Sequence, residues 1–210
     1  SIKMKKIIQI VLSIAIVVLG YLVWESIQAP LRFNKEKDAR QLATVLKLKD
    51  IRTAQVAYKD EYGKFTASFD TLIDFIKNDS MKLVKAEGAL SDELLAQGWT
   101  EAVAVQEGLI TRDTLRIAIK DTLFKSPDFN ADLLWQVPFT KNDTFEMATA
   151  MLSVSKLQVN VFEAKVHYDI LLHGLEEQEI INLNDRMQNQ NNFPGVRVGN
   201  IEEPNNNAGN

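Results

Sequence analysis

An uncharged run near the N-terminus is the feature that most constrains this chain. It extends from Ile7 to Trp24, with the sequence IIQIVLSIAIVVLGYLVW. At a helical rise of about 1.5 Å per residue such a run spans about 27 Å, close to the ~30 Å hydrocarbon core of a bilayer. Aromatic rings with a polar edge favour the headgroup level, and such rings stand at the far end of this run. The sequence therefore predicts a membrane anchor over residues 1–29 that includes Ile7, Ile10, Leu12, Ile16, Leu19, Tyr21 and Trp24.

Two other interpretations of the apolar run fit less well. A cleaved signal peptide needs small residues at positions −3 and −1 of the cleavage site. The best candidate site follows Ala29, but it has Ile27 at −3 and Pro30 at +1, and both are unfavourable. A buried core helix this long and uncharged would need a larger domain around it than the remaining chain offers. We therefore expect an uncleaved anchor that contacts membrane lipid.

The charges that flank the anchor give no clear orientation. Lysines within residues 3–6 favour a cytoplasmic N-terminus, whereas basic residues within residues 32–40 lie inside the counting window on the other side. A short N-terminal tail before one span is the usual layout of a signal-anchor. We therefore expect a single-pass inner-membrane protein with its N-terminus in the cytoplasm and its main domain in the periplasm.

Residues 30–64 have the pattern of a long amphipathic stalk helix. Pro30 predicts a break after the anchor, because proline disfavours helical geometry in the residue before it, and Asn34 can then cap a new helix. Gly63 stands where a glycine would end that helix. The side chains expected to pack the helix on a sheet recur at three- and four-residue steps and are followed by an aromatic residue; they are Leu48, Ile51, Ala54, Tyr58, Tyr62 and Phe65.

The end of this stalk has a recognisable pattern. Ile51, Ala54, Tyr58, Gly63 and Phe65 fit the form I-x-x-A-x-x-x-Y-x-x-x-x-G-x-aromatic, and a second apolar helix is expected over residues 69–76. Residues 5–78 thereby resemble the N-terminal region of type IV pilins and type II secretion pseudopilins. Most of the chain is also similar to uncharacterised single-span envelope proteins of the Bacteroidota. The pilin resemblance implies a long helix packed on an antiparallel sheet and a place in a membrane assembly.

The chain departs from the pilin pattern at the anchor. Pilin precursors have a glycine cleavage site followed by an aromatic residue and by a glutamate near position five of the mature helix. Residues 7–16 contain no glutamate. The resemblance therefore does not extend to processing by a prepilin peptidase or to assembly by a pilus machine.

The segment from residue 65 to residue 186 predicts a small α+β domain. Strands are expected over 80–88, 114–124, 132–139, 144–152 and 156–168, with short helices over 91–110 and a closing helix over 175–186. A change of apolar phase between Val161 and Phe162 suggests a bulge in the last strand. Short turns between the later strands leave no room for crossover helices, so the sheet should be antiparallel. The Asn-rich tail, 187–210, should be extended or disordered.

The composition argues against several functions. The net charge of −4 comes without a basic patch, which disfavours binding to nucleic acid. The absence of cysteine excludes thiolate chemistry and disulfides within this sequence. The histidines, His167 and His173, fit a strand edge more simply than a metal site, and no catalytic or phosphate-binding motif occurs. We therefore expect no enzymatic activity, no cofactor and no metal.

Two functions fit best after these exclusions, ahead of a third option, a hydrolase that carries no recognisable motif. The first is a non-enzymatic structural or interaction subunit of a membrane-associated assembly that serves secretion, motility or envelope biogenesis. Such a subunit would belong to a hetero-oligomer of membrane-assembly proteins, and its sheet edge or tail could bind a partner by strand addition. The alternative is a membrane-tethered ligand-binding or chaperone-like domain with a pocket lined by Trp99, Trp135 and Phe139.

Overall fold

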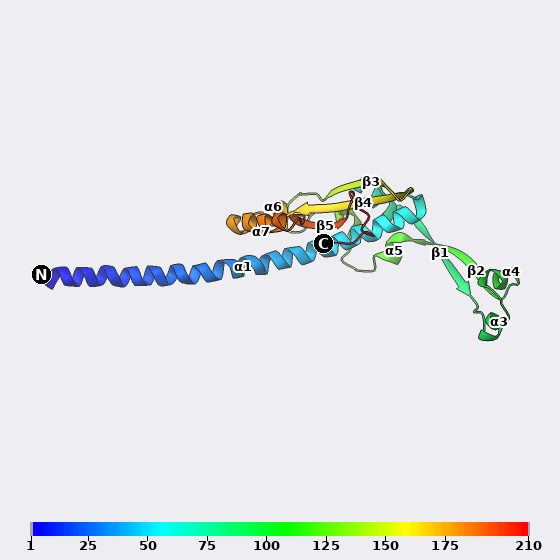
Figure 1. Ribbon diagram of the computed structural model, residues 1–210, viewed down its shortest axis with the longest axis horizontal. Helices are drawn as coiled ribbons and strands as arrows, with labels where there is room; N and C mark the ends of the chain where they lie inside the picture. The colour runs from blue at the N-terminus through cyan, green and yellow to red at the C-terminus, as the bar shows by residue number, and fades with distance from the viewer. Residues whose placement is uncertain (1, 210) are drawn as a thin grey trace.

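The fold is organised along one very long helix. The computed structural model describes residues 2–209, with side chains except those of residues 2–3, 83–87 and 111–114. Helix α1 (Ile2–Tyr62) extends alone through its N-terminal half and carries the rest of the protein along its C-terminal half (Figure 1). We call the part packed on α1 the head. The architecture is α+β, as expected, with small antiparallel sheets.

Helix α1 does not break at Pro30. The proline lies inside the continuous helix, and Asn34 is therefore an internal residue and not a cap. Both expectations were wrong. Proline in a helix interior costs about 3 kcal/mol, but a second helix would need its own costly nucleus and two new termini. The long helical segments on both sides of Pro30 make continuation the more favourable outcome.

The stalk ends at the predicted glycine. Gly63 has φ of 74°, and its N–H donates to the carbonyl of Lys59 at 2.7 Å. Helix α2 (Phe69–Asn78) follows after a short loop and begins with a side-chain cap, because the Oγ of Ser68 accepts from the N–H of Thr71 at 3.3 Å. This helix buries an apolar face made of Leu72, Phe75 and Ile76.

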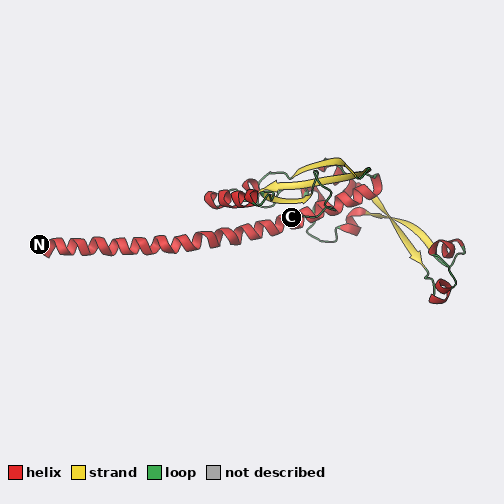
Figure 2. Cartoon of the chain, in the orientation of Figure 1, coloured by secondary structure: helices red, strands yellow, loops and turns green. Residues whose placement is uncertain are grey.

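The main sheet has three antiparallel strands in the order β3-β4-β5. Strands β3 (Glu146–Val154) and β4 (Leu157–His167) form a hairpin, and β5 (Gly195–Gly199) pairs with the other edge of β4 (Figure 2). Alternate residues of β4, namely Phe162, Ala164 and Val166, point into the core. The core lies between this face of the sheet, α1 and α2.

Strand β4 contains no bulge opposite β3. The pairing stays in step from Glu146 opposite Lys165 to Val154 opposite Leu157. The apolar phase appeared to switch because every residue from Val161 to Ala164 is buried, so both faces of the strand are covered at this point. The predicted bulge was therefore wrong.

The Asn-rich tail takes part in the fold. Helix α7 (Glu177–Asn189) extends past the expected domain boundary at residue 186, and β5 comes from the tail itself. Val196 and Val198 of β5 are buried, and this strand supplies most of the contact between the sheet and α1. The sequence predicted a tail that is either extended or disordered. Its residues 195–199 are extended, and they form an ordered strand that belongs to the core.

A two-stranded arm leaves the head at the end far from the N-terminus (Figure 1). Strands β1 (Ser80–Glu87) and β2 (Thr111–Ala118) pair antiparallel along their whole length, and the short helices α3 (Asp92–Ala96) and α4 (Glu101–Gln106) lie at its end. The strand predicted over 114–124 begins earlier and stops at Ala118, where α5 (Ile119–Leu123) starts.

The strand predicted over 132–139 does not form. Residues Ala131–Leu133 form a 3₁₀ turn, η1, because the side chain of Asn130 accepts from the N–H of Asp132 at 3.0 Å. Phe139 then takes φ of 64°, which interrupts extended geometry, and only a single bridge joins Gln136 to Thr144. A last short helix, α6 (Tyr168–Leu171), follows β4.

Candidate functional site

The apolar run of α1, residues 7–24, is uncharged on all sides and uncovered. The predicted anchor side chains Ile7, Ile10, Leu12, Ile16, Leu19, Tyr21 and Trp24 are each between 60% and 64% exposed. A helix that is apolar all round is normally buried in a protein core or a membrane. The helix is long and apolar enough for one membrane span.

The contact between the head and α1 begins a short distance after the apolar segment ends. Phe33 is 6% exposed and belongs to the main core cluster. It lies about 14 Å along the helix from Trp24, the last aromatic residue of the apolar run. The packed head thus begins within a few turns of the segment that suits a bilayer.

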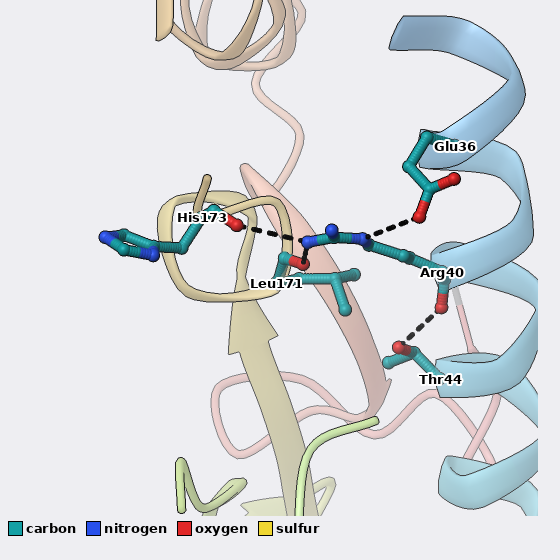
Figure 3. Close-up of polar contacts among 5 residues, drawn as sticks. All are labelled: Glu36, Arg40, Thr44, Leu171 and His173. Carbon is teal, nitrogen blue, oxygen red and sulfur yellow. Dashed lines mark hydrogen bonds and ion pairs between the residues drawn. The ribbon is translucent and has the colours of Figure 1, made fainter. Parts of the chain in front are cut away.

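Arg40 fastens the stalk to the head. Its Nη1 donates to the carbonyl oxygens of Leu171 at 3.1 Å and of His173 at 3.2 Å, and its Nε donates to Glu36 at 3.3 Å (Figure 3). The Arg40 side chain is only 14% exposed, so these bonds form in a partly dry site. They satisfy carbonyls at the C-terminal end of α6, where a cation is favoured. One turn further, the Thr44 hydroxyl donates back to the Arg40 carbonyl at 2.8 Å.

The predicted packing face of α1 is largely buried. Leu48, Ile51, Ala54, Tyr58 and Phe65 are each at most 9% exposed. The Phe65 ring lies 4.8 Å from that of Phe162 on the sheet, whereas the Tyr58 ring meets Phe75 of α2 edge-on at 5.1 Å. The stripe therefore serves two contacts, one with the sheet and one with α2.

Tyr62 differs from the expectation. It is 50% exposed, its ring packs on Tyr58 and Phe75, and its hydroxyl donates to Asp79 at the end of α2. The hydrogen bond to Asp79 raises the pKa of the Tyr62 hydroxyl. The prediction that Tyr62 buries against the sheet was wrong. In the last turn of α1 this side chain points towards α2, and the sheet does not cover it.

Gln55 is a structural residue that periodicity did not reveal. It is fully buried, its Nε2 donates to the Thr66 carbonyl at 2.6 Å, and its Oε1 accepts from the Thr66 N–H at 3.1 Å. The side-chain amide thereby satisfies both backbone hydrogen-bonding groups of Thr66, as a neighbouring strand would, and holds the loop after Gly63 in place. The sequence offered one indication of this role: Gln55 stands directly after Ala54 and three residues before Tyr58, on the face of the helix predicted to be buried.

A cleft of about 550 Å³ opens between α1 and the loop after α5. Burial lowers the pKa of the Lys47 amine and raises the pKa of the Asp50 carboxyl, and each group's charge partly opposes the shift of the other. On the opposite wall the rings of Phe124 and Phe129 stack at 4.0 Å. The lining also includes Ala43, Leu46, Leu123, Lys125, Ser126, Asp128 and Asn130. Such a cleft suits a small ligand with both charged and apolar parts.

A buried carboxylate lies on the outer face of the sheet. Glu163 is 4% exposed and forms ion pairs with Lys165 at 2.8 Å and Arg197 at 3.5 Å. Both cations also lie over the Phe193 ring, at 5.5 and 5.7 Å. Glu163 is therefore balanced by its neighbours, which fits a structural role.

The histidines have separate surroundings. The His167 ring packs on Phe193 at 4.6 Å, and His173 contributes its carbonyl to Arg40. Within the side chains that the structure describes, no group of three or more His, Asp or Glu residues could hold a metal ion.

The pocket expected from the aromatic residues is not formed. Trp99 lies between α3 and α4 in the chain, and these helices stand at the end of the arm (Figure 1). Trp135 and Phe139 follow η1 and precede β3 of the main sheet. Phe139 is 60% exposed, with the Arg40 guanidinium 5.7 Å from its ring centre. The prediction failed because the arm carries Trp99 away from the other two residues.

Comparison of the chain with known protein families, with curated proteins and with solved structures found no match. The geometry alone defines the class: an α+β protein whose long N-terminal apolar helix, compatible with a single membrane span, continues into the core of its head.

Proposed function

We propose that this chain is a non-enzymatic, single-span envelope protein that acts as a structural or interaction subunit of a membrane-associated assembly. The observation that carries the proposal is the continuity of α1. One helix includes both the exposed apolar segment and the buried stalk face, and it stays helical through Pro30. A head fixed in this way keeps a set height and orientation over the bilayer, which an assembly subunit needs.

The contacts between stalk and head support a rigid connection. Phe33, Arg40 and Gln55 attach α1 to the head at points spread along the helix. The Arg40 and Gln55 contacts are hydrogen bonds of defined direction, so they fix the rotation of the helix as well as its position. We infer that movement of the anchor in the membrane is transmitted to the head as a unit.

The proposed location is the inner membrane, with the N-terminus in the cytoplasm and the head in the periplasm. Support comes from the resemblance of residues 5–78 to pilins and pseudopilins. A long helix packed on an antiparallel sheet agrees with that resemblance. The proposed processes are secretion, motility or envelope biogenesis, in a hetero-oligomer with other membrane-assembly proteins.

Membrane fractionation followed by purification tests the proposal. The full chain should stay in the pellet after carbonate extraction, and it should co-purify with a constant set of membrane proteins in mild detergent. Protease added to intact spheroplasts should digest the head. Release by carbonate, or a chain that purifies alone at native expression level, would contradict the proposal.

The cleft beside Lys47 favours a second candidate function, which is ligand binding by a tethered domain. The test is a thermal-shift screen of the full chain in detergent with amino acids and short peptides, because these carry both charges and apolar groups. A ligand of the cleft should raise the melting temperature of the parent protein but not of Lys47→Met. An equal shift in both proteins would place the ligand elsewhere.

A further inference from the structure

The end of the arm is a unit separate from the main core. We call residues 88–110, which connect β1 to β2, the tip. Its buried apolar residues are Ala104 and Ile110, and neither belongs to the core cluster that holds the head together. The tip stands at the end of the arm, on the side of the head opposite the N-terminus (Figure 1). The fold of the head therefore does not explain why the chain extends this far.

The tip has little internal stabilisation. Helices α3 and α4 have 5 and 6 residues, far below the ~12–15 residues at which an isolated helix becomes even marginally stable. A two-stranded hairpin is also marginal by itself. A segment of this kind gains order when another surface covers it.

Large apolar side chains of the tip remain open to solvent. Leu95, Val103 and Leu109 are 54%, 40% and 48% exposed. Leu94 and Trp99 beside them are only partly buried. Several large apolar side chains left exposed on one small projecting element make that element a candidate interaction surface.

The tip also concentrates the negative charge of the chain. It contains Asp92, Glu93, Glu101 and Glu107 and no lysine or arginine. These acids equal the whole net charge of −4, so the rest of the chain is balanced. All of them lie at exposed positions of the same segment as the exposed apolar side chains. The surface is therefore apolar and acidic at once.

We propose that the tip binds a basic, amphipathic segment of a partner protein, most simply a helix with an apolar stripe flanked by lysine or arginine. The apolar side chains supply burial, and the acids select a positively charged partner and guide its approach. This inference rests on the proposed function, because it names the partner chemistry of an assembly subunit.

Two other occupants fit the tip less well. An anionic lipid surface repels acidic side chains, and the tip lies at the far end of the protein from the apolar half of α1. A second copy of this chain has its basic stretch, residues 32–49, on the stalk beside the anchor. Copies anchored in one bilayer keep that stretch nearer the membrane than the tip, so the two surfaces do not meet.

Site-specific photo-crosslinking of the full chain in its native membrane tests the proposal. A photoreactive residue is placed at Leu95 or Leu109 in the tip and, as matched controls, at Met151 or Leu157, which are 63% and 69% exposed on the β3–β4 hairpin. The tip positions should give a product with one protein, joined through a segment of net positive charge. The control positions should not give that product.

Charge reversal and tip replacement sharpen the test. Glu93→Lys with Glu107→Lys should lower the yield of the product about tenfold or more, since like charges facing each other cost well over 1.4 kcal/mol. The matched control is Glu202→Lys with Glu203→Lys, at two exposed positions of the tail, and it should leave the yield of the product unchanged. Replacing residues 88–110 by Asn-Gly joins Glu87 to Thr111, which are already paired, and should remove the crosslinked partner from the proteins that co-purify with the chain, while the head keeps its melting temperature.

The outcomes separate this inference from the proposed function. A product joined to a neutral or acidic segment, to lipid or to a second copy of the chain would overturn the inference, as would equal loss of yield in both charge-reversed pairs. If partners still co-purify in full with the tip replaced, the inference fails while the proposed function stands. If the parent chain co-purifies with no partner at all, the proposed function itself fails.

Discussion

The guanidinium of Arg40 lies 3.1 Å from the carbonyl oxygen of Leu171, a residue 131 positions later in the chain. This bond joins the lower stalk to the last turn of α6. The same nitrogen also donates to the His173 carbonyl, so one side chain joins α1 to two backbone carbonyls of the head.

Arg40→Ala should destabilise the head. Hydrogen bonds to charged groups contribute about 1.5–3 kcal/mol, and here the loss also leaves carbonyl groups in a partly dry site. The measurement is the free energy of unfolding of the full chain in detergent. Arg40→Lys should recover only part of the loss, because an ammonium cannot hold the forked geometry. Lys35→Ala, at an exposed stalk position, is the control and should change stability by less than about 0.5 kcal/mol.

The two tyrosines at the end of the stalk should respond differently to truncation. Tyr58 is 9% exposed and Tyr62 is 50% exposed. Tyr58→Ala should cost about 3–5 kcal/mol, the range for a buried aromatic residue, whereas Tyr62→Ala should cost clearly less. Thermal unfolding of both variants beside Asp60→Ala, a change at an exposed neighbour, measures the difference. Equal losses at the two tyrosines would mean that the packing described at α2 is wrong.

Two glycines with the same backbone geometry give a matched comparison. Gly63 and Gly199 both have φ of 74°, but a Cβ at Gly63 would meet nothing within 4 Å, and one at Gly199 would lie 2.0 Å from the Phe162 carbonyl oxygen. Gly63→Ala should therefore cost about 1 kcal/mol for the backbone conformation alone. Gly199→Ala should cost several times as much, because β5 must move away from β4. Chemical denaturation of both variants tests the order, and a larger loss at Gly63 would contradict it.

The cleft should leave a signature in the pH dependence of stability. Burial raises the pKa of Asp50 in the folded state, so the folded protein binds this proton more tightly than the unfolded chain. The resulting stabilisation is fully present below the unfolded pKa of about 3.9 and is lost as the pH rises through the folded pKa. The stability of the parent relative to Asp50→Asn should therefore increase on acidification from neutral pH. A difference that shrinks on acidification would show that the carboxylate is stabilised in its charged form.

Local sequence patterns determined much of the fold. The uncharged run from Ile7 to Trp24 and the stripe from Leu48 to Tyr58 depend only on the spacing of side chains along a helix. Gly63 ends the stalk because the αL conformation is available to glycine at little cost. The hairpin of β3 and β4 was visible because its strands are neighbours in the chain and carry β-forming residues. In each of these cases the physical cause lies within a few residues.

Other features depended on contacts between distant parts of the chain. The sequence GVRVG in an Asn-rich tail has no strand signal of its own, but the free edge of β4 offers it backbone partners and α1 covers its valines. The partners of Arg40 and Gln55 are likewise set by which loops the folded chain brings to them. Only the tertiary structure decided these points, because the free energy that settles them comes from burial and hydrogen bonds between segments that are remote in sequence.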